Sequence, residues 1–561
     1  MRMFMEKHRI GQDIAWCAVC WLGVLMVLPL WSLSASWFSA GSSIFWDHLW
    51  ETELWRLLYQ TMILLIGVTF GSLVLGTVLA LTTTLFDFPG RKIIIILCAL
   101  PLAIPSYVMG FIWLDVLDYN SFVQTFWRQH FQGSLNISGY MGITMAMSFS
   151  LFPYVFLMAR IALKGVDQRL WEASMSLGHG YMASFRRVIM PMLLPPLLTA
   201  GAFVAMEVIS DFGTVSVFSY NTLTTAIFKA WFGFFDLSAA LQVASVLLVL
   251  ALGVYVLSRR IHGNKSHWYM HFSQSNDFTA KSAFSLPAKQ GYGLFCLCLI
   301  CVTFTTLLPL YALVDMASNQ QDLNTWSLVL PDILRSIFLA FIVSVLIMAI
   351  SCCGLFLIRS APRIYTLKLF KQWFHRDSYL RGLFQLPTLG YAFPGAVLAV
   401  ALFVPVYALE NRFSFPFFTT TIALLVAAMA IHFFVVGFQP LAESYGKVPH
   451  CLDESSESLG VRGKGLFWRI HWPFLRYPVM FAGLMVFMDV IKEMPLTLML
   501  RPLGWDTMSV KVYEWSSEGE WQKAAVPALV MVVFSMLLLA VMGYMKKRSL
   551  FHLSKKQMCL P

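Results

Sequence analysis

Five ionisable residues lie inside long apolar runs of this 561-residue chain. Glu207 and Asp211 are four positions apart, so in a helix they share one face. At an offset of 282, a second run carries Asp489 and Glu493, with Lys492 beside them. A carboxylate is costly in hydrocarbon unless it faces protein or water. The pattern predicts four acids around a pore mouth, able to attract a cation or to hold a gate through hydrogen bonds.

Two interpretations of these acids stay open. In the first, they line a translocation pathway. In the second, they pair with Lys492 or with backbone groups, or already lie at the membrane interface. Counted from the cytoplasmic end near Leu194, a helical rise of about 1.5 Å per residue puts Glu207 roughly 20 Å and Asp211 roughly 26 Å along the helix, in the outer leaflet.

The elements that must position these residues follow from an internal duplication. The stretch 172–191, EASMSLGHGYMASFRRVIMP, returns at 454–473 as ESSESLGVRGKGLFWRIHWP. Each copy has a Gly six residues after the Glu and a Pro thirteen residues after that Gly. Carried on without a gap, the offset gives sixteen identities in the forty-three positions of 172–214.

The shared residues predict a helix, a sharp turn and a second helix in each copy. Gly178 and Gly460 are expected to end the first helix, because glycine readily takes the left-handed backbone of a C-terminal cap. The second helix is expected to begin near Phe185 and Arg187, repeated as Phe467 and Arg469. Pro191 and Pro473 then mark the entry into an apolar run. Each copy is therefore a polar helix-turn-helix between two membrane spans.

The composition requires a polytopic all-α membrane protein. The chain is 58% hydrophobic and 12% charged, with a mean hydropathy of +0.70, which excludes a water-soluble globule. Apolar windows of about twenty residues, enough to cross a bilayer, predict twelve spans, six in each half. They lie near 14–34, 58–82, 93–115, 140–162, 194–215, 237–258, 290–315, 334–358, 382–407, 418–437, 477–499 and 525–545.

The net charge of +11 reflects topology, and no nucleic acid partner is expected. With the N-terminus inside, most Lys and Arg fall in cytoplasmic segments, as the positive-inside rule expects. The C-terminus is then cytoplasmic too. Residues 1–258 form the first half and 290–561 the second, joined by a cytoplasmic linker at 259–289. Because six spans return the chain to its starting side, the two repeats are parallel.

Prolines interrupt one span at the same place in each half. The first half reads Pro101-Leu102-Ala103-Ile104-Pro105-Ser106, and the second half carries Pro387 to Gly395. A proline inside a membrane helix frees backbone groups that only protein neighbours or water can satisfy. Paired breaks indicate the pathway; a packing kink is the alternative.

The duplicated stretch resembles the EAA loop of permease subunits of ABC importers. In that family the loop docks on the ATPase. The resemblance covers loops 163–193 and 438–475. It implies docking roles for Glu172, Ala173, Ser174, Gly178, Arg187 and Pro191, and for Glu454, Ser455, Ser456, Gly460, Arg469 and Pro473. The second loop departs from the motif, because Ser455-Ser456 replace Ala-Ala and His471 takes the usual aliphatic place.

A second likeness narrows the family. Residues 491–502, IKEMPLTLMLRP, resemble a segment of fused two-half permeases in the ferric iron branch of ABC importers, the binding-protein-dependent transport system inner membrane components. Ser210 to Thr214 resembles its first-half partner. Thiamine, polyamine and phosphorylated-solute permeases have similar halves and stay as alternatives.

The resemblance also implies the other subunits of the importer and its location. It predicts the type I importer permease fold in a bacterial inner membrane, a periplasmic substrate-binding protein, two ATPase subunits and the lipid bilayer as partners, and ATP with Mg²⁺ bound on the ATPases. No cofactor is expected on this chain. Fe(III) is a hard cation that prefers oxygen ligands, yet a permease that held it tightly would not release it, so no metal ligands are assigned.

Other function classes fit less well. A secondary transporter driven by an ion gradient through the same acids needs no docking site for a motor. An enzyme is not indicated, since the sequence has no HExxH or GxSxG constellation. Residues 460–465, GVRGKG, lack the spacing and the Ser or Thr of a P-loop, so a partner subunit must hydrolyse the ATP.

Overall fold

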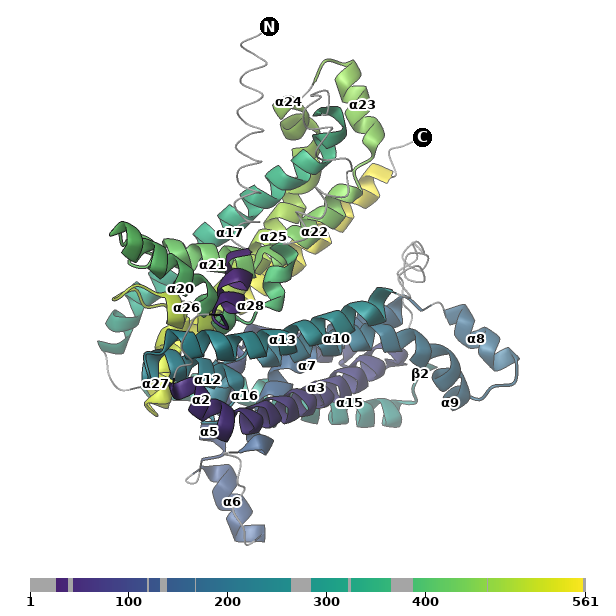
Figure 1. The fold of residues 1–561 in the computed structure, drawn as a ribbon. Helices are drawn as coiled ribbons and strands as arrows, with labels where there is room; N and C mark the ends of the chain where they lie inside the picture. The colour runs from purple at the N-terminus through teal and green to yellow at the C-terminus, as the bar shows by residue number, and fades with distance from the viewer. Residues whose placement is uncertain are drawn as a thin grey trace. The chain divides into compact units, whose positions relative to one another are not determined.

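A computed structural model describes residues 27–38, 44–118, 121–131, 139–166, 168–263, 284–320, 324–364, 387–461 and 463–557. The first expected span, 14–34, and the linker 259–289 lie largely outside these residues. The described chain is helical apart from one parallel pair of two-residue strands, β1 and β2. It divides into two compact units, each described by itself (Figure 1).

One unit contains residues 42–327 and 511–533. Its elements are α2 (Ile44–Thr52), α3 (Leu54–Leu85), β1 (Phe86–Asp87), α4 (Arg91–Ala99), η1 (Leu100–Ala103), α5 (Ser106–Val116), α6 (Phe122–Phe131), α7 (Tyr140–Lys164), α8 (Gln168–Ser176), α9 (Tyr181–Ser184), η2 (Phe185–Ile189), α10 (Met190–Ser210), α11 (Gly213–Val217), α12 (Leu223–Phe228), η3 (Lys229–Gly233), α13 (Leu237–Gly263), β2 (Phe284–Ser285), α15 (Ala288–Val302), η4 (Thr303–Leu307) and α16 (Leu308–Ser318). Helices α3, α7 and α10 pack along one another at its centre.

The other unit contains the described residues before 42, residues 328–510 and residues from 534 onward. Its elements are a helical stretch at 27–35, α17 (Asn324–Ile364), η5 (Pro387–Ala392), α20 (Gly395–Phe413), α21 (Ala423–His432), α22 (Phe434–Gly446), α23 (His450–Ser458), α24 (Lys464–Leu466), η6 (Phe467–His471), α25 (Trp472–Lys492) and α26 (Pro495–Leu500). Helices α27 (Met508–Ser517) and α28 (Trp521–Gln557) contribute residues to both units, as does α17, whose residues 324–327 belong to the unit described first.

The two units exchange segments relative to the two sequence repeats. The stretch at 27–38 packs within the unit that holds the second repeat, where the Ser32 hydroxyl donates to the Ala401 carbonyl at 2.7 Å. Conversely, helices α15 and α16 pack on first-repeat helices, and the Thr306 hydroxyl donates to the Leu97 carbonyl at 3.2 Å. Each compact unit is thus completed by chain that lies beyond its own repeat.

The apolar helices match the predicted spans. Nine described helices are long and apolar enough to cross a membrane, and two bent helix pairs bring the number to eleven. These correspond to every expected span except the first. Only 28% of the most apolar window of α3 is buried inside the protein, and Phe70 is 68% exposed. Such apolar side chains suit contact with lipid.

The repeats are visible element by element. A π-helical turn lies at 185–189 and again at 467–471, the same offset of 282 as the sequence repeat. The helices that follow, α10 and α25, each have 21 residues. Each ends immediately before an acid, Asp211 or Glu493. The predicted fold class, an all-α membrane protein built from two similar halves, is confirmed.

The predicted breaks are present. The helices on either side of Pro105 meet at a bend of 102°, and Pro105 precedes the first residue of α5. In the second repeat, Pro394 occupies the same position before α20. A further bend of 48° between α21 and α22 was not predicted.

Candidate functional site

The two duplicated loops fold alike. In the first, the amides of Leu177, Gly178 and His179 donate to the carbonyls of Ala173, Met175 and Ser174 at 3.2, 3.0 and 3.3 Å. In the second, the three residues at the offset of 282 make the same bonds at 3.2, 3.0 and 2.9 Å. Gly178 has φ +83° and Gly460 φ +78°. The predicted left-handed glycine cap is confirmed in both loops.

Each loop presents an acid and a leucine to solvent. Glu172 and Glu454 are exposed. Leu177 is 79% exposed and its counterpart Leu459 is 82% exposed. Leaving a leucine side chain in water is unfavourable, and the two loops do so at equivalent positions.

The other expected docking residues divide by exposure. Exposed residues are Ala173, Arg187, Pro191, Ser455, Arg469 and Pro473. Ser174 and Ser456, by contrast, are buried inside the loops. The Ser174 hydroxyl donates to the Ser184 hydroxyl at 2.8 Å, and the Ser456 hydroxyl donates to the Val461 carbonyl at 3.2 Å. These two serines hold the loop fold and do not face outward.

The start of the second helix differs from the prediction. It begins at Tyr181 in the first loop and at Lys464 in the second, not near Phe185 and Phe467. The stretch 181–210 is one continuous helix with a π-helical turn inside it. The residues that were expected to begin the helix, Phe185 and Arg187 with Phe467 and Arg469, lie in the π-helical turns.

A polar cluster lies beneath the second loop. Arg359, on α17, donates from Nε to Asp453 Oδ2 at 2.7 Å, and its other nitrogens donate to the carbonyls of Tyr445 and Pro449 at 3.2 and 3.1 Å. His471 Nε2 lies 2.9 Å from Asp453 Oδ1, and the Tyr445 hydroxyl lies 2.8 Å from His471 Nδ1. We call Arg359, Tyr445, Asp453 and His471 the polar clamp. It joins α17, α22, α23 and η6.

The polar clamp is buried. The side chains of Arg359, Asp453 and His471 are 7%, 2% and 1% exposed. Burial acts to raise the pKa of Asp453, but hydrogen bonds from Arg359 and His471 outweigh it and hold that pKa below its ordinary value of 3.8. Sequence reasoning noted His471 as a departure but missed the clamp. The only local signal was the additional acid, Asp453, directly before Glu454.

Asp211 closes the break in the first repeat. Its φ of −70° and its amide, which donates to the Glu207 carbonyl at 3.0 Å, are those of a helix, and its ψ of 123° turns the chain away from α10 only after Asp211. Its carboxylate accepts hydrogen bonds from the Thr214 amide at 2.7 Å, from the Thr214 hydroxyl at 2.9 Å and from the Ser106 hydroxyl at the start of α5. The acid therefore ties the broken span to α11.

Glu493 occupies the same place in the second repeat. Its φ of −69° is helical and its ψ of 118° turns the chain away from α25 only after this residue. Glu493 Oε1 accepts from the Leu496 amide at 3.2 Å. A Cβ built on Gly395, the first residue of α20, would lie 2.9 Å from that oxygen. The glycine thus makes room for the carboxylate where the first repeat uses a serine hydroxyl.

Glu207, Asp489 and Lys492 lie on α10 and α25 and are partly exposed. The first belongs to one compact unit and the other two to the other unit. Among the residues that the structure describes, no group of three or more His, Cys, Asp and Glu side chains is placed to hold a metal ion.

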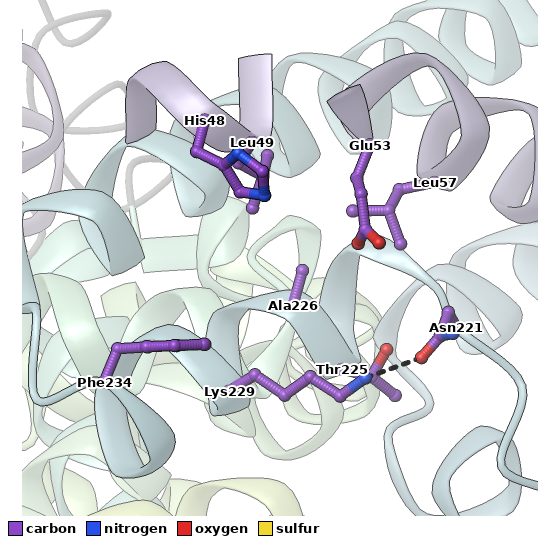
Figure 2. Close-up of a pocket in the computed structure, with 9 residues that line it drawn as sticks. All are labelled: His48, Leu49, Glu53, Leu57, Asn221, Thr225, Ala226, Lys229 and Phe234. Carbon is purple, nitrogen blue, oxygen red and sulfur yellow. Dashed lines mark hydrogen bonds between the residues drawn. The ribbon is translucent and has the colours of Figure 1, made fainter. Parts of the chain in front are cut away.

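A hollow of about 230 Å³ lies among α2, α3, α12 and η3. Figure 2 shows the His48 imidazole and the Glu53 carboxylate pointing into it from one side, with Lys229 along the other. The Lys229 ammonium donates to Asn221 Oδ1 at 2.8 Å. Sequence reasoning did not single out these residues, which come from segments about 170 residues apart.

Comparison of the sequence with known proteins identifies the family to which the chain belongs. Residues 72–263 match the model of the binding-protein-dependent transport system inner membrane component. The chain is 30% identical over 199 residues to the probable sulfate transport system permease protein cysT of Prototheca wickerhamii, covering 34% of this chain and 76% of that relative. The chain belongs to the binding-protein-dependent transport system inner membrane component family. It is therefore a multi-pass inner membrane permease subunit of an ABC importer, a transport subunit and not an enzyme.

A longer relative matches both halves of the permease. The Fe(3+)-transport system permease protein FbpB 2 of Haemophilus influenzae is 26% identical over 493 residues, 87% of this permease and 90% of that protein. The molybdate/tungstate permease protein WtpB of Thermococcus kodakarensis is 29% identical over 211 residues, covering 37% of this permease and 77% of the relative. Shorter relatives thus match one region and the longer one nearly the whole permease, which confirms the predicted resemblance to fused two-half permeases.

Proposed function

We propose that this permease carries ferric iron across the inner membrane and is driven by two ATPase subunits that grip its two duplicated loops. ATP and Mg²⁺ bind on those subunits. A periplasmic binding protein delivers the iron, and both termini of the permease are cytoplasmic. The observation that carries the docking proposal is the repeated exposed pair, Glu172 with Leu177 and Glu454 with Leu459.

The chemistry of that pair fits a protein partner. Leu177 and Leu459 each follow their glutamate by five residues, and each precedes a glycine cap that fixes the turn. A rigid apolar knob with a charge beside it suits insertion into a groove, where buried apolar area supplies affinity and the charge supplies orientation. Because the knob occurs twice, the partner is expected to bind as two copies.

The docking test uses the leucines. The permease is purified with its ATPase subunits after Leu177→Asp, Leu459→Asp or both substitutions. Loss of the ATPase subunits from the double variant supports the proposal, provided that a thermal unfolding measurement shows the permease itself to be folded. Met182→Asp, which changes another exposed apolar residue, 63% exposed, is the control. Retention of both ATPase subunits by the double leucine variant would overturn it.

The iron proposal rests on likeness to the iron permease over nearly the whole chain. The second candidate is an oxyanion such as sulfate or molybdate, because relatives with those printed substrates match one region at 29–30% identity. Proteoliposomes that hold the complete importer decide between them. Uptake of radioactive Fe(III) supports iron. Uptake of radioactive sulfate or molybdate, with no uptake of Fe(III), supports the oxyanion.

We also propose that Glu207, Asp211, Asp489, Lys492 and Glu493 border the pathway. Asp211 and Glu493 are the pair to test. The Asp211 carboxylate joins the broken span to α11, and the Glu493 carboxylate accepts from the Leu496 amide of α26 close to Gly395, the first residue of α20. The double variant Asp211→Asn with Glu493→Gln removes two charges and keeps acceptor oxygens. Slower transport by an importer that retains its ATPase subunits supports a pathway role, whereas full transport removes it.

A further inference from the structure

The residues of the polar clamp are not repeated in the sequence of the first loop. At the offset of 282, Asp453, His471 and Tyr445 correspond to Trp171, Ile189 and Leu163. Ile189 and Leu163 are buried, at 2% and 6% exposure. Apolar residues thus stand where the second loop has an acid, an imidazole and a phenol. The outer folds of the two loops are alike, but their attachments to the spans differ.

The clamp is a closed chain of charge-assisted hydrogen bonds. Arg359 carries a permanent positive charge and Asp453 balances it. The ionised carboxylate only accepts hydrogen bonds, so His471 carries its proton on Nε2 and donates it to Asp453. The Tyr445 hydroxyl then donates to His471 Nδ1. With a neutral imidazole the cluster has no net charge, which suits its burial.

The polar clamp also restricts the directions in which α23 can move. Arg359 uses three nitrogens, on an acid and two carbonyls, and its guanidinium stacks over the Tyr445 ring at 5.1 Å. Bonds in several directions hold α23 against sliding along α17 and against rotating on α22. Apolar packing, which is non-directional, opposes such movements less.

We infer that the polar clamp holds the second loop rigidly on its membrane spans. The second loop is then the stiffer of the two connections between the ATPases and the spans. The inference rests on the proposed docking function. A force applied at Leu459 reaches α17, α22 and η6 through Asp453 and its partners. The first loop has apolar residues at the corresponding positions, so it deforms more under the same force before its spans move.

One test needs no variant. Hydrogen–deuterium exchange is measured on the complete importer, and the backbone amides of 450–458 are compared with those of 168–176. We expect the amides of α23 to exchange at least about tenfold more slowly than those of α8. Equal rates, or faster exchange in α23, would overturn the inference.

The second test separates stiffness from docking. His471→Ile places the first-loop residue in the clamp, and Tyr445→Phe removes one hydroxyl. We expect both variants to retain the ATPase subunits, and the transport per ATP hydrolysed to fall about fivefold or more in His471→Ile. His471→Gln keeps a donor toward Asp453 and is expected to recover part of that loss. The matched control in the first loop is Ser184→Ala, which removes the Ser174 contact.

The outcomes separate the two proposals. If His471→Ile loses its ATPase subunits as completely as the double leucine variant, the clamp belongs to the docking surface and the stiffness inference fails. Unchanged coupling in His471→Ile also overturns it. If His471→Ile does not assemble, the exchange comparison on the unaltered importer decides. If the leucine variants keep their ATPases while α23 is the slower-exchanging helix, the docking proposal fails and the stiffness difference stands.

Discussion

Asp453 Oδ1 lies 2.9 Å from His471 Nε2, and both side chains are almost fully buried beneath an exposed loop. Neither residue is among those that the resemblance to the family singled out for docking. Their contact shows that the second loop is joined to the helices beneath it by polar chemistry, whereas the first loop carries Trp171 and Ile189 at the same positions.

Asp453→Ala is expected to destabilise the permease strongly. It leaves the buried Arg359 guanidinium without its counter-charge, and breaking one side of a buried ion pair costs about 3–5 kcal/mol. Thermal unfolding of the purified permease measures the loss. The double variant Arg359→Met with Asp453→Leu is the control, because it removes both charges together. If the single variant unfolds at the same temperature as the unaltered permease, the clamp contributes nothing to stability.

The same acid predicts a dependence of stability on pH. Arg359 and His471 hold the pKa of Asp453 below 3.8, so the folded state favours the ionised carboxylate. Its contribution to the free energy of unfolding is present above that ordinary value and is lost as pH falls through the lower folded value. The unfolding temperature of the permease should therefore fall more steeply with acid below about pH 4 than that of Asp453→Asn. Parallel curves for the two proteins would contradict this.

Gly178→Ala and Gly460→Ala are expected to weaken the loops. Both glycines have positive φ, and a side chain there costs about 1–2 kcal/mol although nothing lies within 4 Å of the added Cβ. The cost is therefore conformational and not steric. Gly180→Ala is the matched control, since Gly180 has φ −67° and equally open space. ATPase co-purification should fall for the first two variants and stay unchanged for the control; equal behaviour of all three would exclude a role for the cap.

Gly395→Ala is expected to disturb the second broken span. The new Cβ would lie 2.9 Å from Glu493 Oε1, so the carboxylate must move and lengthen its bond to the Leu496 amide. Transport should fall while ATPase binding stays. Gly446→Ala, with nothing within 4 Å of its Cβ, is the control. Normal uptake by Gly395→Ala would show that this carboxylate contact is dispensable.

Local sequence signals predicted the parts of the fold that depend on local chemistry. Apolar run length located the spans, the glycines at 178 and 460 located the helix ends, and Pro105 and Pro394 located the breaks. Each of these depends on the backbone preference of one residue or on the apolarity of a neighbouring stretch, so it is visible without knowledge of tertiary contacts.

The features that the sequence did not predict depend on tertiary contacts. Regular spacing suggested that Glu207 and Asp211 share a helical face, but it did not predict that the chain leaves the helix directly after Asp211, or that the Asp211 carboxylate accepts hydrogen bonds from Ser106 and Thr214. The polar clamp joins Arg359 to Asp453 across 94 positions. No periodicity in the sequence connects residues so far apart.

The exchange of segments between the two compact units has a consequence for biosynthesis. The unit built from residues 42–327 is completed by residues 511–533, which the ribosome delivers only after residues 328–510 have been made. At about 5–20 residues per second, the nascent chain waits roughly 10–40 s in the membrane before that last piece arrives. During this interval the early helices depend on the insertion machinery or on lipid to cover surfaces that the late segment will occupy.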